Sequence, residues 1–230
     1  MTGLVSPAME VSILRPWWPS DVPERERNHD WTLAWWKEHF PEWEIVEAPG
    51  ISRAAALNRC AAESHGEILI KADVDCWCEP AQIEAAVALA ITEPGLVYPT
   101  SRFENLSREA TDLLFSDERL KVWSDDAFDL TTLGSVGGIY VVRRDHFEEL
   151  SGEDERFIGW GFEDAAFDYA ALTLLGPAVH LGGALWHLWH PPAPDFDTTY
   201  TTYQANRERC HLYEQAIGDV DAMGALVDEP

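Results

Sequence analysis

Over its first hundred residues the chain alternates between short apolar runs and longer stretches in which apolar residues recur at helical spacing. The run 67–72, Glu-Ile-Leu-Ile-Lys-Ala, has the length and apolar content of a buried strand. In 28–40, Trp31, Ala34 and Trp35 follow helical spacing, which predicts an amphipathic helix with Asn28 as its N-cap. The same reasoning predicts strands at 10–14, 44–47 and 96–98 and helices at 52–64 and 80–91.

This order of elements predicts an α/β fold with a mostly parallel central sheet flanked by helices. Strands that alternate with helices usually pair in parallel through right-handed crossovers. Ligands of such sheets bind in the crevice at the carboxyl ends of the strands. The acidic turn Asp73-Val74-Asp75 directly follows strand 67–72, so we expect it to lie at that crevice.

The second half of the chain has a weaker pattern. The stretch 101–134 is polar and acidic with little periodicity, which favours a mobile loop that a bound ligand would order. No linker rich in Gly, Ser or Pro separates the halves, so we expect a single domain over 1–218 and a loose acidic tail over 219–230. Further strands are expected at 137–143 and 178–181, and further helices at 162–175 and 199–217.

Composition excludes some classes of partner. The formal net charge of −25 repels nucleic-acid phosphates and anionic lipid surfaces, which argues against nucleic acid as a partner. No apolar stretch reaches the roughly 18 residues of a membrane span, and the N-terminus lacks the pattern of a signal peptide. The four cysteines fit no zinc-binding spacing, which favours free thiols in a reducing cytoplasm. The sequence therefore predicts a soluble cytoplasmic protein.

Three groups of residues carry candidate chemistry: the acidic turn at 73–75, a second acidic pair and a histidine pair. Glu163 and Asp164 follow a Gly-Trp-Gly turn at the expected start of helix 162–175. His187 and His190 are three residues apart, so they can face the same way on a helical turn. Carboxylate oxygens with one or two imidazoles suit Mn²⁺, with Mg²⁺ as the alternative. The plainer interpretations are a solvated turn, a helix cap and structural histidines.

Several stretches together resemble glycosyltransferases of the GT-A fold, a Rossmann-like fold of nucleotide-diphospho-sugar transferases. The resemblance is to the β-1,4-galactosyltransferase family and to related bacterial family 2-type transferases, and it covers roughly 10–210. Its most specific part is Gly159-Trp-Gly-Phe-Glu-Asp164, preceded by the Gly-Gly strand at 137–143. The helix that begins Ser52-Arg-Ala, the Asp-Val-Asp turn and the His-Leu-Trp-His run also match.

The sequence departs from the family pattern at three positions. Ala165 follows Glu-Asp where the family often has another acidic residue, and Ser52 stands where Asn is common. Cys-Trp-Cys follows Asp75 in place of aliphatic residues. These departures bear on the identity of the sugar and of the acceptor more than on the class of reaction.

The resemblance implies a metal-dependent transfer of a hexose or N-acetylhexosamine from a UDP-sugar to an acceptor hydroxyl, with inversion. It assigns Asp75 and His190 as metal ligands, with His187 as a companion. Asp164 would act as general base, and Glu163 would hold hydroxyl groups of the acceptor or donor. The implied acceptor is a glycan, a glycoconjugate or a protein. The residues implied in donor binding are Arg15, Arg53, Asp73, Val74, Gly138 and Trp160, with Asp73 on the ribose or on the metal through water.

Two other functions stay open at this point. A nucleotidyltransferase on a related sheet would usually carry a Gly-rich loop with Lys or Arg after the first strand, whereas this chain has Arg15-Pro-Trp-Trp-Pro. A non-catalytic carbohydrate-binding protein that kept the fold should have lost Asp75 or Asp164, and both are present.

Overall fold

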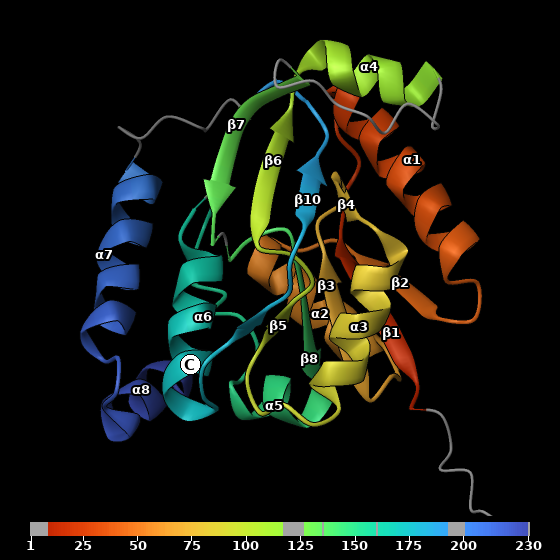
Figure 1. Cartoon of the computed structure of the whole chain (residues 1–230). Helices are drawn as coiled ribbons and strands as arrows, with labels where there is room; N and C mark the ends of the chain where they lie inside the picture. The colour runs from red at the N-terminus through yellow and green to blue at the C-terminus, as the bar shows by residue number, and fades with distance from the viewer. Residues whose placement is uncertain (1–8, 117–126, 135, 160, 193–200, 230) are drawn as a thin grey trace, which may run out of the picture.

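A computed structural model describes residues 9–116, 127–134, 136–159, 161–192 and 201–229 (Figure 1). Its main sheet has six strands in the order β2-β1-β3-β8-β5-β9. The pairs β1–β2, β1–β3 and β5–β9 are parallel, whereas β8 runs antiparallel to both β3 and β5. The expected α/β fold is confirmed, with a mixed sheet. The strands are β1 (Val11–Pro16), β2 (Glu44–Ala48), β3 (Ile68–Ala72), β5 (Val97–Tyr98), β8 (Ile139–Arg143) and β9 (Val179–His180).

A second sheet of four strands, in the order β4-β10-β6-β7, stands beside the main one. The mobile loop expected over 101–134 is wrong for the residues that the structure describes there, because they form β6, a helix and β7. These strands were missed because β7 pairs with β6 alone, and β6 in turn pairs with β10, far along the chain. The elements are β4 (Cys76–Cys78), β6 (Arg102–Leu106), α4 (Arg108–Ser116), β7 (Phe128–Leu133) and β10 (Ala184–His187).

The other helices flank the two sheets. Figure 1 shows α6, α7 and α8 together on one side of the molecule and α1 and α4 on the other. Ser52 caps α2 as expected, with its hydroxyl accepting a hydrogen bond from the Ala55 amide at 3.2 Å. These helices are α1 (Pro23–His39), α2 (Arg53–Glu63), α3 (Pro80–Ala90), α5 (Arg144–Glu149), α6 (Glu163–Leu174), α7 (Thr201–Gln215) and α8 (Val220–Val227).

Two local expectations about the helices are wrong. Helix α1 begins at Pro23, so Asn28 lies inside it and not at its N-cap. The Asn28 amide is buried and donates to the carbonyl of Trp189 at 3.1 Å. The expected loose tail contains α8, because Asp219 caps that helix through the Ala222 amide and Met223 is fully buried.

The core lies on both faces of the main sheet. Ile13, Ile70 and Val141 belong to one apolar cluster, and their sequence neighbours Leu14, Leu69 and Val142 belong to the other. This division follows from the alternation of side chains along a strand and explains why the central strands are apolar throughout. Among the described residues, none of the helices has the length and apolar character that crossing a membrane requires.

Candidate active site

The acidic turn lies at the carboxyl end of β3, where backbone hydrogen bonds fix its shape. The amide of Asp73 donates to the carbonyl of Gly138 at 2.9 Å, and the Thr32 hydroxyl donates to the carbonyl of Val74 at 2.6 Å. Gly138 has φ +88°, and a Cβ there would lie 3.0 Å from the side chains of Leu185 and Phe103. The glycine is therefore required by its backbone conformation and by packing. Its carbonyl in turn holds the acidic turn.

Asp75 and the two histidines converge beside this turn. Asp75 Oδ2 lies 3.2 Å from His190 Nε2 and 3.6 Å from His187 Nε2. Strand pairing brings them together, because His187 is opposite Cys76 in the β4–β10 pair and the Leu188 amide donates to the carbonyl of Asp75 at 2.8 Å. The expected helical turn at the histidines is wrong. His187 ends strand β10, and the chain beyond it returns His190 to within 5.2 Å, ring to ring.

The chemistry of this donor set suits a divalent cation. One ligand atom from each residue of Asp75, His187 and His190 lies within 4.8 Å of the other two. His190 Nδ1 lies 2.7 Å from the carbonyl of Pro191, so an Nδ1–H donor there leaves the Nε2 lone pair facing Asp75. Two imidazole nitrogens and a carboxylate oxygen therefore lie close enough to share one divalent cation.

The electrostatics of the cluster follow from its burial and its pairing. Burial alone would raise the pKa of Asp75, but the charges and hydrogen bonds of His187 and His190 hold that pKa well below its usual range. Burial alone would lower the pKa of His190, but the hydrogen bond and charge of Asp75 raise it above its usual value. A cation bound here would take the place of the proton on His190.

A second cluster lies next to the first and is built around Arg53 at the start of α2. Arg53 forms ion pairs with Asp73 at 3.3 Å, with Glu163 at 2.6 Å and with Asp164. Lys71 Nζ lies 2.9 Å from Asp73 Oδ1 and 3.2 Å from Asp164 Oδ1. The structure thus brings together Arg53, Asp73, Glu163 and Asp164, all expected from sequence, and adds Lys71, which sequence reasoning missed. The available signal was a lysine in an apolar strand two residues before Asp73, on the same side of β3.

The carboxyl groups of this cluster differ in acidity. Burial would raise the pKa of Asp164, but the charges of Arg53 and Lys71 hold it below its usual value. Burial raises the pKa of Glu163, and the charge of Arg53 offsets only part of that effect. Asp164 is therefore the more acidic member of the pair.

The turn before α6 positions these two carboxylates. Gly159 and Gly161 both have positive φ, and so does Phe162, the N-cap of α6, at φ +77°. This left-handed path places Glu163 and Asp164 in the first helical turn, where the helix dipole favours negative charge. Trp160, in the middle of this turn in the sequence, lies outside the described residues. A cavity of about 190 Å³ opens beside the two carboxylates. Its lining consists of Arg53, Gly161, Phe162, Glu163, Asp164 and Tyr203, the last from α7.

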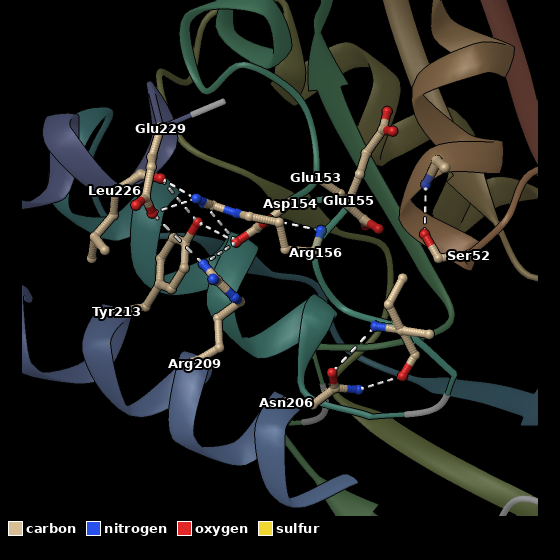
Figure 2. A network of polar contacts seen from close by, with 12 residues as sticks. Ser52, Glu153, Asp154, Glu155, Arg156, Asn206, Arg209, Tyr213, Leu226 and Glu229 are labelled. Atoms are coloured by element: carbon tan, nitrogen blue, oxygen red, sulfur yellow. Dashed lines mark hydrogen bonds and ion pairs between the residues drawn. The ribbon is translucent and has the colours of Figure 1, made fainter. Parts of the chain in front are cut away.

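Helix α7 also holds the turn in place from behind. Asn206 donates to the carbonyl of Ile158 at 2.9 Å and accepts from its amide at 3.2 Å. Figure 2 shows Arg156, Arg209 and Tyr213 directed at Asp154, which lies just before the turn. The Tyr213 hydroxyl donates to Asp154 at 3.0 Å, and the guanidinium of Arg156 pairs with it at 2.6 Å. These contacts join the C-terminal helices to the candidate site.

Arg15 lies next to the acidic turn, because the Thr32 hydroxyl that it contacts also bonds the carbonyl of Val74. Its side chain is fully buried, and its guanidinium binds Glu47 at 2.9 Å and the Thr32 hydroxyl at 3.1 Å. The expectation that Arg15 contacts a nucleotide conflicts with this burial, because the guanidinium is turned into the protein. Sequence alone could not separate a buried arginine from an exposed one at the end of β1.

Comparisons with known proteins concern the family and the fold of the chain. The family model described as "Glycosyltransferase like family 2" matches residues 43–180, more than half of the chain. No curated protein matches the sequence.

Three solved structures illustrate the likeness of the fold. A mannosyltransferase from Pyrobaculum calidifontis, in complex with GDP-Man and Mn²⁺, is 17% identical with a TM-score of 0.51, over 95% of this chain and 70% of that one. Glucosyl-3-phosphoglycerate synthase from Mycobacterium tuberculosis, with Mn²⁺ and UDP-glucose, is 13% identical with a TM-score of 0.54, over 92% and 80%. GalNAc-T7 with UDP, GalNAc and Mn²⁺ is 11% identical with a TM-score of 0.56, over 95% and 54%.

Proposed function

The chain belongs to the glycosyltransferase-like family 2, and on that premise we propose that it is a metal-dependent, UDP-sugar-using enzyme. It transfers a hexose or an N-acetylhexosamine to the hydroxyl of a glycan, glycoconjugate or protein acceptor, with inversion at the anomeric carbon. The observation that carries this proposal is the meeting of two clusters at one turn. Asp75 lies with His187 and His190 on one side of the turn. On the other side, Asp73 and Asp164 both form ion pairs with Lys71.

Asp75, His187 and His190 would hold the cation, Mn²⁺ or alternatively Mg²⁺. When bound, a divalent cation supplies positive charge beside the departing diphosphate. Arg53 is about one-quarter exposed, at 26%, and lines the cavity, so its guanidinium is placed to bind diphosphate oxygens. Asp73 would hold the donor ribose or reach the cation through water.

Asp164 serves as general base in this scheme. Its carboxylate takes the proton from the acceptor hydroxyl as that oxygen attacks the anomeric carbon. The bond from the anomeric carbon to the diphosphate oxygen breaks at the same time, and the leaving group keeps the electron pair. Glu163, one residue away, holds a hydroxyl of the acceptor or donor, and Trp160 stacks on the sugar. A base of this kind contributes about 10²- to 10⁴-fold in rate.

The test is a donor screen combined with Asp164→Asn. UDP-galactose, UDP-glucose and their N-acetyl forms are offered with Mn²⁺ or with chelator, while UDP release and thermal shift are measured. We expect Mn²⁺-dependent UDP release from one of these donors. Asp164→Asn should lose about 10²- to 10⁴-fold in turnover while its donor-dependent thermal shift stays. Asp145→Asn, on the exposed surface of α5, is the matched control.

The outcomes separate the alternatives. Near-normal turnover in Asp164→Asn would overturn its role as base. Donor binding without any UDP release would favour the non-catalytic carbohydrate-binding protein, and release of pyrophosphate from a nucleoside triphosphate would favour the nucleotidyltransferase. The anomeric configuration of the product, read by NMR, tests inversion.

A further inference from the structure

Lys71 has no part in the reaction as proposed, yet it is sealed against the candidate site. Its side chain is 1% exposed, and Ile70 and Ala72 flank it in β3. The Nζ atom lies 2.9 Å from Asp73 Oδ1, 3.2 Å from Asp164 Oδ1 and 5.9 Å from the centre of the Tyr140 ring. An ammonium group is tolerated at such depth only where carboxylates pair with it. The ammonium group of Lys71 therefore stays paired with Asp73 and Asp164.

Arg53 contacts the same two acids, but its side chain is partly exposed to solvent. It is 26% exposed, lines the cavity and divides its guanidinium among Asp73, Glu163 and Asp164. A diphosphate offers such a group a bidentate partner, so a bound donor would draw Arg53 away from Asp164. Lys71 has no access to solvent and no comparable freedom. Arg53 is thus the exchangeable cation of the cluster, and Lys71 is the permanent one.

The balance of charge around Asp164 makes this difference matter. Arg53 from α2 and Lys71 from β3 favour its ionised form. Glu163, its neighbour in α6, and Glu153, in the turn after α5, act against it as carboxyl groups. The phenols of Tyr98 from β5 and Tyr140 from β8 also face it. Once Arg53 has turned to the donor, Lys71 is the cation that remains on Asp164 among the described residues.

We propose that Lys71 is a positioning residue that keeps Asp164 ionised and fixes its distance from the Asp73-Val74-Asp75 turn during the reaction. The inference rests on the proposed function, since it assumes that Asp164 is the base. It adds that the base and the donor-binding turn share one buried counter-charge.

The pH dependence of kcat tests this role, because a purely structural lysine would not move it. Removing a positive charge within about 4 Å raises the pKa of a carboxyl group by about one to three units. With Mn²⁺ kept saturating at every pH, so that the His190 proton does not limit activity, we expect Lys71→Met to shift the acid limb of the kcat profile upward by about one pH unit or more. Lys71→Arg should restore much of the wild-type profile. Lys37→Met, on the exposed face of α1, should leave the profile unchanged.

A second measurement covers the case in which Lys71→Met folds poorly. The melting temperatures of Lys71→Met, Asp164→Asn and the double variant form a double-mutant cycle. We expect Lys71→Met to lower the melting temperature much less in the Asp164→Asn background than in the wild type. Equal lowering in both backgrounds, or an acid limb that stays in place in an active Lys71→Met enzyme, would overturn the proposal. If Asp164→Asn itself turns over normally, the proposed function has failed instead.

Discussion

Replacing Glu153 by Gln should stabilise the protein increasingly as pH rises. The Glu153 side chain is 1% exposed, its Oε1 accepts a hydrogen bond from the Tyr140 hydroxyl at 3.2 Å, and its Oε2 has no hydrogen-bond partner among the described residues. Burial, together with the nearby charge of Asp164, raises its pKa from 4.5 to about 8. Glu153 is therefore protonated in the folded protein at neutral pH, and Gln has nearly the same shape as that protonated side chain.

The magnitude follows from proton linkage. Between pH 4.5 and 8 the unfolded chain has released the Glu153 proton and the folded chain retains it. The stability that this group contributes is present below pH 4.5 and is lost as pH rises toward the folded pKa. The loss is about 1.4 kcal/mol per pH unit, which gives about 3 kcal/mol between pH 5.5 and 7.5. Glu153→Gln lacks the proton and avoids this loss.

Urea unfolding at pH 5.5, 6.5 and 7.5 measures the effect directly. We expect the free energy of unfolding of Glu153→Gln, relative to the wild type, to grow by about 3 kcal/mol across this range. Glu149→Gln, on the exposed surface of α5, controls for the change in net charge. A difference between Glu153→Gln and the wild type that stays constant over the three pH values would refute the reasoning.

Two further predictions concern the acidic turn and the proposed cation. His190→Ala should abolish the thermal shift caused by Mn²⁺, whereas His211→Ala, on the exposed face of α7, should keep it. In the wild type, Mn²⁺ affinity should fall about tenfold per pH unit below the raised pKa of His190, because the ion must displace a proton from that residue. An Mn²⁺ titration that gives one affinity from pH 5 to pH 8 would contradict histidine ligation. Gly138→Ala should lower the free energy of unfolding by about 1–3 kcal/mol, since alanine is strained at φ +88° and its Cβ meets Leu185 and Phe103. A loss below about 0.5 kcal/mol in urea unfolding would show that the backbone relaxes there.

The sequence by itself determined the elements whose signals are local. The capped helix after Ser52, the apolar strand before Asp73 and the helix after Phe162 each depend on spacing and on neighbouring residues. The candidate site residues Asp75, Glu163 and Asp164 could also be identified from the sequence, because each stands in a short motif. Periodicity and caps act within about one turn of helix, so a single sequence contains them in full.

The tertiary structure decided everything that depends on a distant partner. Strand β6 is held between β7 and the distant β10, and the two histidines converge because β10 ends beside Asp75. Arg15 and Arg53 look alike in the sequence, yet one is sealed against Glu47 and the other faces the cavity. In the sequence Lys71 only interrupts an apolar strand, whereas in the structure its Nζ lies 3.2 Å from Asp164 Oδ1. Burial and pairing set the charge and exposure of such groups, and neither is a property of the local sequence.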